Sequence, residues 1–192
     1  MPNHCSNQVT IRSCSVDILN IMEFLANEDT LFDFNQLVPM PEELNDVQYL
    51  DSGGTTYYYS ATKWHSSADC NLDKKPFDFP RLEWVEKHGL DSFTIKRLER
   101  QYGTAKWYDW CVQNWGTKWN AYEVDYKLNA LDELRNEITY TFFTAWMEPR
   151  PIMRALMGYL SQPGFDKDLE MRWRFVDEDD NFNGEVTRDD EV

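Results

Sequence analysis

Hydrophobic and polar positions first alternate with a strand period and then change to a helical period near the N-terminus. β-branched side chains alternate with polar ones over residues 7–13, which is typical of a strand. Apolar residues then recur at helical spacing in residues 15–29, behind an expected N-cap at Ser15. Residues 31–38 alternate again and end at Pro39, which predicts a second strand. The opening is therefore predicted to be β-α-β.

The C-terminal part returns to the strand period. Residues 120–127 predict a short strand and residues 137–146 the strongest strand of the chain. Prolines open a helix in residues 149–164, and residues 169–179 alternate as a strand. After a turn, residues 185–188 predict one more strand.

The middle of the chain has a different character. Residues 51–79 are rich in turn formers and are expected to form a long loop, with a short strand at 55–61. Three short helices are predicted to follow. Each is expected to end at a glycine that adopts the left-handed conformation, at Gly89, Gly103 and Gly116.

These elements predict an α+β fold of one domain, residues 1–192. Its core is expected to be a ferredoxin-like βαββαβ sandwich with an extra C-terminal strand, built from residues 1–38 and 120–192. Residues 39–119 would be a loop and mainly helical insertion. In that arrangement the strands at 7–13, 137–146 and 169–179 share one sheet.

The distribution of charge follows the same division. Residues 1–60 carry nine acidic and one basic residue (−8), residues 61–135 twelve of each (0), and residues 136–192 thirteen and six (−7). The net charge of −15 repels nucleic acid and anionic membranes. Nucleic acid is therefore an unlikely partner, and no membrane partner is expected.

The four cysteines are widely spaced and form no CxxC pair, so no zinc ribbon or thioredoxin motif is expected. The N-terminus shows neither a signal peptide nor an apolar span, which favours free thiols in a cytoplasm. No cofactor and no catalytic set is predicted.

Four of the eight tryptophans lie in residues 107–124, "WYDWCVQNWGTKWNAYEV". A helix that is apolar nearly all round is usually buried, so we expect Trp110 in the core. The alternative is an aromatic platform that stacks bases or sugars. The mixture of Lys118, Trp119 and Asn120 just after this helix is a candidate binding site, in which the lysine would bind a carboxylate or phosphate.

Three further segments contain side chains with possible chemistry. Asn3 and His4 at the N-terminus are candidate binding residues. A nucleophile built from His4 and Cys5 is not favoured, because neighbours in an extended segment point to opposite faces. A polar loop contains potential zinc ligands in one cluster only, at His65, Asp69, Cys70 and Asp73.

Residues 179–190 resemble a calcium loop. However, Asn183-Gly184 is a strong hairpin signal, and a strand precedes it where an EF-hand has a helix. A hairpin is therefore predicted, with calcium as the alternative.

Several motifs resemble those of a family carried by bacteriophages and conjugative plasmids. They are "MPNHCSNQVTI", "FNQLVPMPEEL", "YDWCVQNWGTKWNA" and "FFTAWMEP", and together they span most of the chain. The family is a domain of unknown function with a YubB-type ferredoxin-like C-terminal domain. The resemblance implies a ferredoxin-like fold and a mobile genetic element in a bacterial cytoplasm, but no activity. The methionine of "TAWMEP" stands where a small polar residue is expected.

Three hypotheses of function follow. The first is an accessory protein that binds a bacterial host protein, as an inhibitor or a DNA mimic, through an acidic face at Asp177, Glu178, Asp179 and Asp180. The second is a ferredoxin-like module for RNA or a nucleotide, which would use the stretch Met171–Phe175. The third is an enzyme that uses Lys118 or His4.

Overall fold

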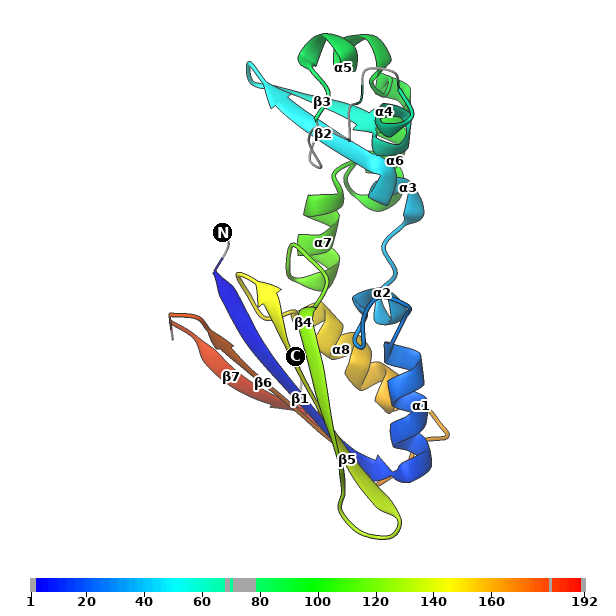
Figure 1. Cartoon of the computed structure of the whole chain (residues 1–192), viewed down its shortest axis with the longest axis vertical. Helices are drawn as coiled ribbons and strands as arrows, with labels where there is room; N and C mark the ends of the chain where they lie inside the picture. Colours follow the sequence, from blue (N-terminus) through cyan, green and yellow to red (C-terminus); the bar gives the residue numbers. More distant parts are fainter. Residues whose placement is uncertain (1–2, 68–69, 71–78, 180, 191–192) are drawn as a thin grey trace. The chain divides into compact units, whose positions relative to one another are not determined.

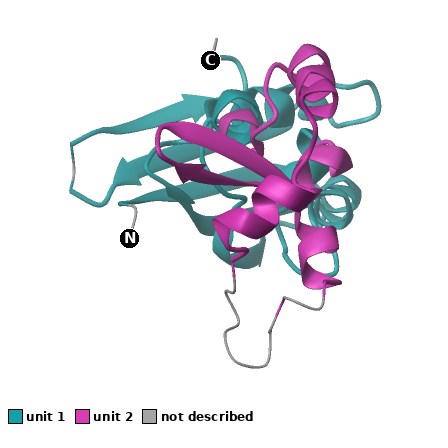
Figure 2. Cartoon of the chain, turned by 90° about the horizontal axis from the view of Figure 1, so that it is seen from above, with its two compact units in different colours: residues 1–39, 111–192 teal, residues 40–110 magenta. Residues whose placement is uncertain are grey.

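The computed structural model of the chain describes residues 3–67, 70, 79–179 and 181–190. The fold is mixed α+β and divides into two compact units (Figure 2). Unit 1 comprises residues 1–39 and 111–192, and unit 2 comprises residues 40–110. Residues 111–119, which the sequence analysis assigns to the insertion, thus group with the sheet. That the two units form a single domain stays a prediction.

Unit 1 is built on a five-stranded antiparallel sheet of order β4-β5-β1-β6-β7 (Figure 1). β1 pairs with β5 on one side and with β6 on the other. The prediction that three distant strands share one sheet is therefore confirmed. The strands are β1 (His4–Cys14), β4 (Tyr122–Ala130), β5 (Arg135–Ala145), β6 (Glu170–Asp177) and β7 (Asn183–Thr187).

Two helices, α1 (Ser15–Leu25) and α8 (Arg150–Leu160), lie on one face of this sheet (Figure 1). The strand period decides which side chains meet them, because alternate residues point to opposite faces. Along β1, Val9 and Ile11 are fully buried on the helix side. Thr10 and its alternate neighbours lie on the other side, which we call the open face.

Large aromatic side chains fill the space between sheet and helices. Phe32 packs edge-to-face on Tyr140 and Trp173, with ring centroids 5.2 and 6.1 Å apart. The indole Nε1 of Trp173 donates a hydrogen bond to the Asn7 Oδ1, which is also buried. The amide of Asn7 in turn donates to the Thr144 hydroxyl. Both the oxygen and the nitrogen of the buried Asn7 amide thus have hydrogen-bond partners.

The predicted strand at 31–38 is wrong. The segment contains a one-turn helix, α2 (Phe34–Leu37), because the Asp33 carboxylate accepts the backbone N–H of Asn35 as an N-cap. Phe32 and Phe34, whose alternation with polar residues suggested a strand, are both completely buried.

The start of α1 also differs from expectation. Cys14 is the N-cap residue, and the backbone N–H of Ser15 donates to the Leu134 carbonyl. The buried Asp17 anchors this end of the helix by accepting hydrogen bonds from the Ser13 hydroxyl and the Asp166 N–H. Burial raises the pKa of this carboxyl, but these hydrogen bonds outweigh burial and lower the pKa below its ordinary value.

Unit 2 combines a β-hairpin with short helices. The predicted short strand at 55–61 is confirmed as β3 (Thr55–Ser60), which pairs with β2 (Val47–Ser52). The predicted loop is wrong for residues 51–52, which belong to β2, and for residues 61–65, which form α4 (Ala61–His65). Gly53 and Gly54 form the turn with φ of 57° and 79°, conformations that other residues rarely adopt. The rest of the predicted loop falls partly outside the described residues. An α3 helix (Glu42–Asp46) precedes the hairpin.

The three predicted short helices are confirmed as α5 (Leu82–His88), α6 (Ser92–Tyr102) and α7 (Trp107–Trp115), of which α7 spans the boundary between the units. Asp91 caps α6 by accepting the Thr94 N–H. Gly103 ends α6 in the left-handed conformation as predicted, whereas Gly89 after α5 has a φ of −63° and is extended, so the predicted left-handed conformation is wrong there. No helix in the described part of the chain is long and apolar enough to cross a membrane.

Two further predictions are confirmed. β6 and β7 form the predicted hairpin, but Asn183 and Gly184 pair with Val176 and Phe175 as part of β7 rather than forming the turn. Trp110 is buried, with 6% of its surface exposed, and Trp115 is also buried. The Trp115 indole donates to the Val38 carbonyl, so this part of the tryptophan-rich stretch is core.

Candidate functional site

A groove runs along β1 on the open face of the sheet of unit 1. Three adjoining hollows of about 520, 470 and 380 Å³ make it up, and neighbouring hollows share Gln8 and Arg174 or Ser6 and Val176. Arginines line one end, which we call the arginine end. Glutamates and aromatic rings line the other, which we call the acidic end.

The positive charge of the arginine end is largely neutralised. Arg172 and Arg174 both contact the Glu185 carboxylate. Arg12 pairs with Glu137, whose oxygen lies 2.6 Å from the Arg12 Nε, and reaches Glu170 at 3.6 Å. Arg188, which also lines this end, donates instead to the Leu169 carbonyl. Because Glu137, Glu170, Glu185 and Asp189 line the same hollows, this end offers little net charge to a phosphate.

The stretch Met171–Phe175 does not supply the exposed aromatics that an RNA module needs. Trp173 is fully buried and Phe175 is nearly so, because both point to the helix side. The open face carries Arg172 and Arg174 at the alternate positions. Gln8 and Thr10 occupy the middle of β1, so bases have no ring to stack on there.

The acidic end gathers residues from the N-terminus and two other parts of the chain. His4 Nδ1 lies 2.6 Å from the Tyr122 hydroxyl, and its ring packs edge-on against Tyr122 and Phe143. The backbone N–H of His4 donates to the Glu178 carboxylate at 3.0 Å. Burial first, and then the charge of Glu123, raise the pKa of Tyr122, so that its hydroxyl stays protonated and available as a donor.

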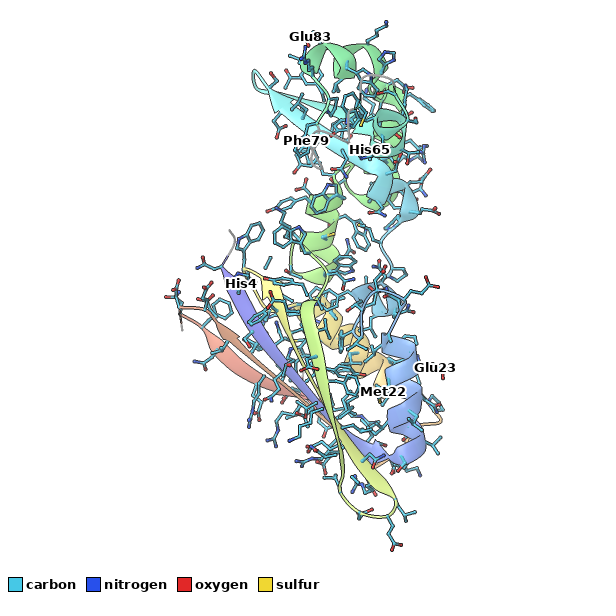
Figure 3. The ribbon with its side chains drawn as sticks, in the orientation of Figure 1. His4, Met22, Glu23, His65, Phe79 and Glu83 are labelled. Carbon is cyan, nitrogen blue, oxygen red and sulfur yellow. The ribbon has the colours of Figure 1, made fainter. Side chains whose placement is uncertain are left out.

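Asn3 belongs to the same end. Its side-chain amide donates to the Asp179 carboxylate at 3.1 Å, and its carbonyl accepts the Trp146 N–H at 2.9 Å. The structure therefore brings two sets of predicted residues together, because Asn3 and His4 bind Asp179 and Glu178. Figure 3 shows His4 at the end of its strand, well away from Glu23 on α1.

The acidic face predicted from the sequence does not include Asp177, because this side chain points to the helix side of the sheet. This residue is buried, at 4% exposure, because it sits at a helix-side position of β6, opposite Cys5. Asn181 donates to its carboxylate at 2.9 Å. Glu178 and Asp179 are exposed as predicted, and Asp180 lies outside the described residues.

Lys118 and Trp119 lie in the loop after α7. The Lys118 ammonium stands 4.6 Å from the ring centroid of Trp119 and 5.7 Å from that of Trp146. Trp119 is 39% exposed and packs edge-on to Tyr122, which connects this pair with the acidic end. These cation–π contacts hold the lysine over aromatic rings.

Asn120, the third predicted residue of that group, has a structural role. Its Oδ1 accepts the backbone N–H of Phe34 at 2.9 Å, and its Nδ2 donates to the buried Asp33 carboxylate at 2.6 Å. Both ends of the amide are thus committed to unit 1, which leaves little capacity for a ligand.

Local sequence patterns did not predict Glu123, Phe143 and Trp146 as residues of this site. Glu123 and Trp146 have φ of 51° and 71°, in the left-handed region that residues other than glycine rarely occupy. A β-bulge between Tyr122 and Asp125 creates the unusual backbone of Glu123. The motifs "WNAYE" and "FFTAW" contain these residues, but only the pairing of β4 with β5 brings the two motifs together.

Within the described ranges, no three His, Cys, Asp or Glu side chains are grouped so that they could hold a metal ion. His65 Nδ1 lies 3.7 Å from the Cys70 Sγ, and Asp69 and Asp73 fall outside those ranges.

Cys5 is buried, and burial is the main reason why the pKa of its thiol rises to about 11. Glu148 and Asp177 raise the pKa further, whereas a hydrogen bond with Thr144 lowers it. A buried neutral thiol is a poor nucleophile. Burial likewise raises the pKa of Cys111 to about 12.

We expect iodoacetamide at pH 8 to modify Cys14 and Cys70 of the native protein, which are partly exposed, at least about tenfold faster than Cys5 and Cys111. Mass spectrometry of tryptic peptides measures the four rates, and unfolding in urea should make them similar. Rapid native labelling of Cys5 would show an accessible thiolate and restore it as a candidate nucleophile.

Comparison of the chain with protein-family models, with curated proteins and with solved structures gives no match in any of the three.

Proposed function

We propose that this protein is an accessory factor of a bacteriophage or conjugative plasmid that acts by binding a bacterial host protein. The acidic end of the groove would receive a basic side chain of that partner. The observation that carries the proposal is a hollow of about 380 Å³ in which two exposed carboxylates, Glu123 and Glu178, stand beside the ring of Phe143. Within the described residues, neither glutamate forms an ion pair.

This combination suits a guanidinium or an ammonium group. The carboxylates supply charge and hydrogen-bond acceptors, and the faces of aromatic rings attract cations. The net charge of −15 favours encounter with a basic surface and raises the association rate at low salt. Trp119, exposed at the margin of the same end, is of the residue type most enriched at the energetic centres of interfaces.

The backbone supports a specialised role for this end. The left-handed conformations of Glu123 and Trp146 cost on the order of 1–3 kcal/mol each, and such strain is concentrated at binding and catalytic sites. Both residues flank the predicted residues Asn3 and His4. The opposite, arginine end lacks this feature, and its paired charges favour neither RNA binding nor DNA mimicry.

The ferredoxin-like fold and the phage or plasmid family belong to the same proposal. The order β4-β5-β1-β6, with α1 and α8 on one face, agrees with a βαββαβ sandwich, and β7 corresponds to the extra strand. Residues 40–110 would then be the insertion between the first helix and the second strand of that core. The motifs described above support the family assignment.

The hollow can be tested with a simple probe, the blocked peptide acetyl-Gly-Arg-Gly-amide. We expect it to shift the amide resonances of His4, Glu123, Phe143 and Glu178 in ¹H–¹⁵N spectra, with a Kd in the millimolar range. Replacing both glutamates with glutamine should weaken binding by about tenfold or more, because two charge-assisted contacts are lost while shape is kept. Glu23→Gln, on α1, is the matched control.

The same variants test whether a host protein binds at this hollow. Tagged wild-type protein and the Glu123→Gln/Glu178→Gln variant are used to capture proteins from a bacterial lysate at low salt, and the captured proteins are quantified by mass spectrometry. A specific partner should be depleted with the double variant and retained with Glu23→Gln. If the arginine peptide shifts no resonance at the acidic end, or acetyl-Gly-Glu-Gly-amide shifts the same ones, the proposed hollow is not a cation site.

A further inference from the structure

The outer edge of β4 is exposed along an unusually long strand. β4 has nine residues and forms one border of the sheet, whereas β7 at the other border has five. In the described part of unit 1, no strand pairs with the side of β4 that faces away from β5. Such an edge presents unpaired backbone groups to any strand that approaches it.

The backbone of Tyr126 shows how this edge is arranged. Its N–H donates to the carboxylate of its own neighbour, Asp125, at 2.8 Å, rather than to a carbonyl of β5. Because N–H groups along an antiparallel strand alternate in direction, Leu128 should present its N–H to the same free edge. Two identical strands could exchange hydrogen bonds at Tyr126 once this N–H leaves the Asp125 carboxylate, which would then be available to Lys127 of the second copy.

The side chains of β4 are self-complementary around the same residue. In an antiparallel pair of two copies with Tyr126 opposite Tyr126, Asp125 lies opposite Lys127 and Val124 opposite Leu128, and each pair occurs twice. A register centred on Asp125 or on Lys127 would instead oppose like charges. The charge of Lys127 already contributes to lowering the pKa of Glu137 on the neighbouring strand, so the lysine side chain lies on the polar open face.

Exposed apolar side chains lie on β4, on the turn of the β4–β5 hairpin and on the first half of α1. Leu134 is 76% exposed and Val16 66%, and the Ser15 N–H to Leu134 carbonyl hydrogen bond of 3.0 Å joins their segments. Figure 1 shows the β4–β5 hairpin at the same end of the unit as the start of α1. The other strongly exposed aliphatic residues of these elements are Leu19, Leu128 and Leu131. Grouped apolar exposure of this kind marks interaction surfaces.

We propose that this surface binds a second copy of the same chain, with the two β4 edges paired antiparallel about Tyr126. The two sheets would then be continuous, and Leu128 of each copy would be covered by Val124 of the other, close to the two-fold axis. The bulge between Tyr122 and Asp125 limits the regular ladder to the residues around Tyr126. This self-association does not depend on the proposed host partner or on the acidic end of the groove.

Sedimentation velocity and light scattering of the full chain over a wide concentration range provide the test. The wild type is expected to show a monomer–dimer equilibrium. Lys127→Asp should raise the dimer Kd about tenfold, because two attractive cross-strand pairs become repulsive. The exchange Asp125→Lys/Lys127→Asp restores opposite charges in the same register and should return the Kd to within about threefold of wild type.

Lys96→Asp is the matched control, since it makes the same charge change at an exposed position of α6, outside the elements that form the proposed surface. It should leave the dimer Kd unchanged. Leu128→Lys tests the apolar contact with Val124 separately and should also weaken the dimer. A wild type that stays monomeric, or a charge exchange that fails to restore association in a variant with native circular dichroism, overturns the proposal. If Lys127→Asp does not fold, Leu128→Lys and the charge exchange still decide it.

Discussion

Replacing Trp173 with alanine is expected to lower the free energy of unfolding by about 3–5 kcal/mol. The side chain is completely buried, and its ring packs against Phe32 and Phe142 at centroid distances of 6.1 and 5.8 Å. Truncation would leave a large cavity between sheet and helices, and would leave the buried Asn7 Oδ1 without the indole donor. Urea unfolding followed by far-ultraviolet circular dichroism measures the change.

Two matched variants separate the contributions of the indole hydrogen bond and of the buried position to this loss of stability. Trp173→Phe keeps most of the ring but removes the indole N–H, so a smaller loss of about 1–3 kcal/mol is expected. Trp119→Ala removes the same type of side chain from an exposed position and should change stability by less than about 1 kcal/mol. A loss below about 1 kcal/mol for Trp173→Ala would contradict the core position and reopen the hypothesis that Met171–Phe175 is a nucleic-acid surface.

Replacing Asp33 with alanine is expected to lower the free energy of unfolding by about 3 kcal/mol. The carboxylate is 3% exposed and accepts hydrogen bonds from the Asn27 and Asn120 amides, both at 2.6 Å, and from the Asn35 backbone N–H at 2.9 Å. These donors connect α2 with the loop after α7. Alanine would leave several of them without an acceptor in a place that water reaches poorly.

The same experiment decides the role of Asn120. Asn120→Ala should cost about 2 kcal/mol, and the Asp33→Ala/Asn120→Ala double variant should lose about 1–2 kcal/mol less than the sum of the two single losses. Glu23→Ala, at an exposed position of α1, serves as the control and should have little effect. Strict additivity of the two losses would mean that the two side chains do not cooperate, and a ligand-binding role for Asn120 would regain support.

The residues that sequence reasoning identified near the N-terminus illustrate what local patterns reveal. The side-chain chemistry of Asn3 and His4 marks them as candidate site residues, and the negative charge of Glu178 and Asp179 marks an acidic face. Neither pattern indicates that the two groups bind each other, because that contact depends on the pairing of β1 with β6 across most of the chain. Glu123 and Trp146 give no local signal at all, since their left-handed backbone follows from a bulge and from a strand end.

The wrong prediction of a strand at 31–38 has a local cause. Phe32 and Phe34 alternate with polar residues as in a strand, but Asp33 and Asn35 use their polar groups to cap a helical turn, and both rings enter the core. The spacing of hydrophobic residues alone cannot distinguish a strand from a capped helical turn over so few residues. The pattern at 55–61 predicts a strand that the structure confirms, but it does not indicate the partner strand β2 or the helix α4.

By itself, the sequence determined the positions of most strands and helices, the glycine helix ends at Gly103 and Gly116, and the burial of Trp110. These features depend on side-chain period and on local backbone preferences, which act over a few residues. Only the tertiary structure decided that Asp177 is buried while Glu178 and Asp179 are exposed, that Asn120 binds Asp33, and that an acidic hollow and a self-complementary edge exist. Such features arise from strand register and from contacts between distant segments, where a shift of one residue exchanges the two faces of a sheet.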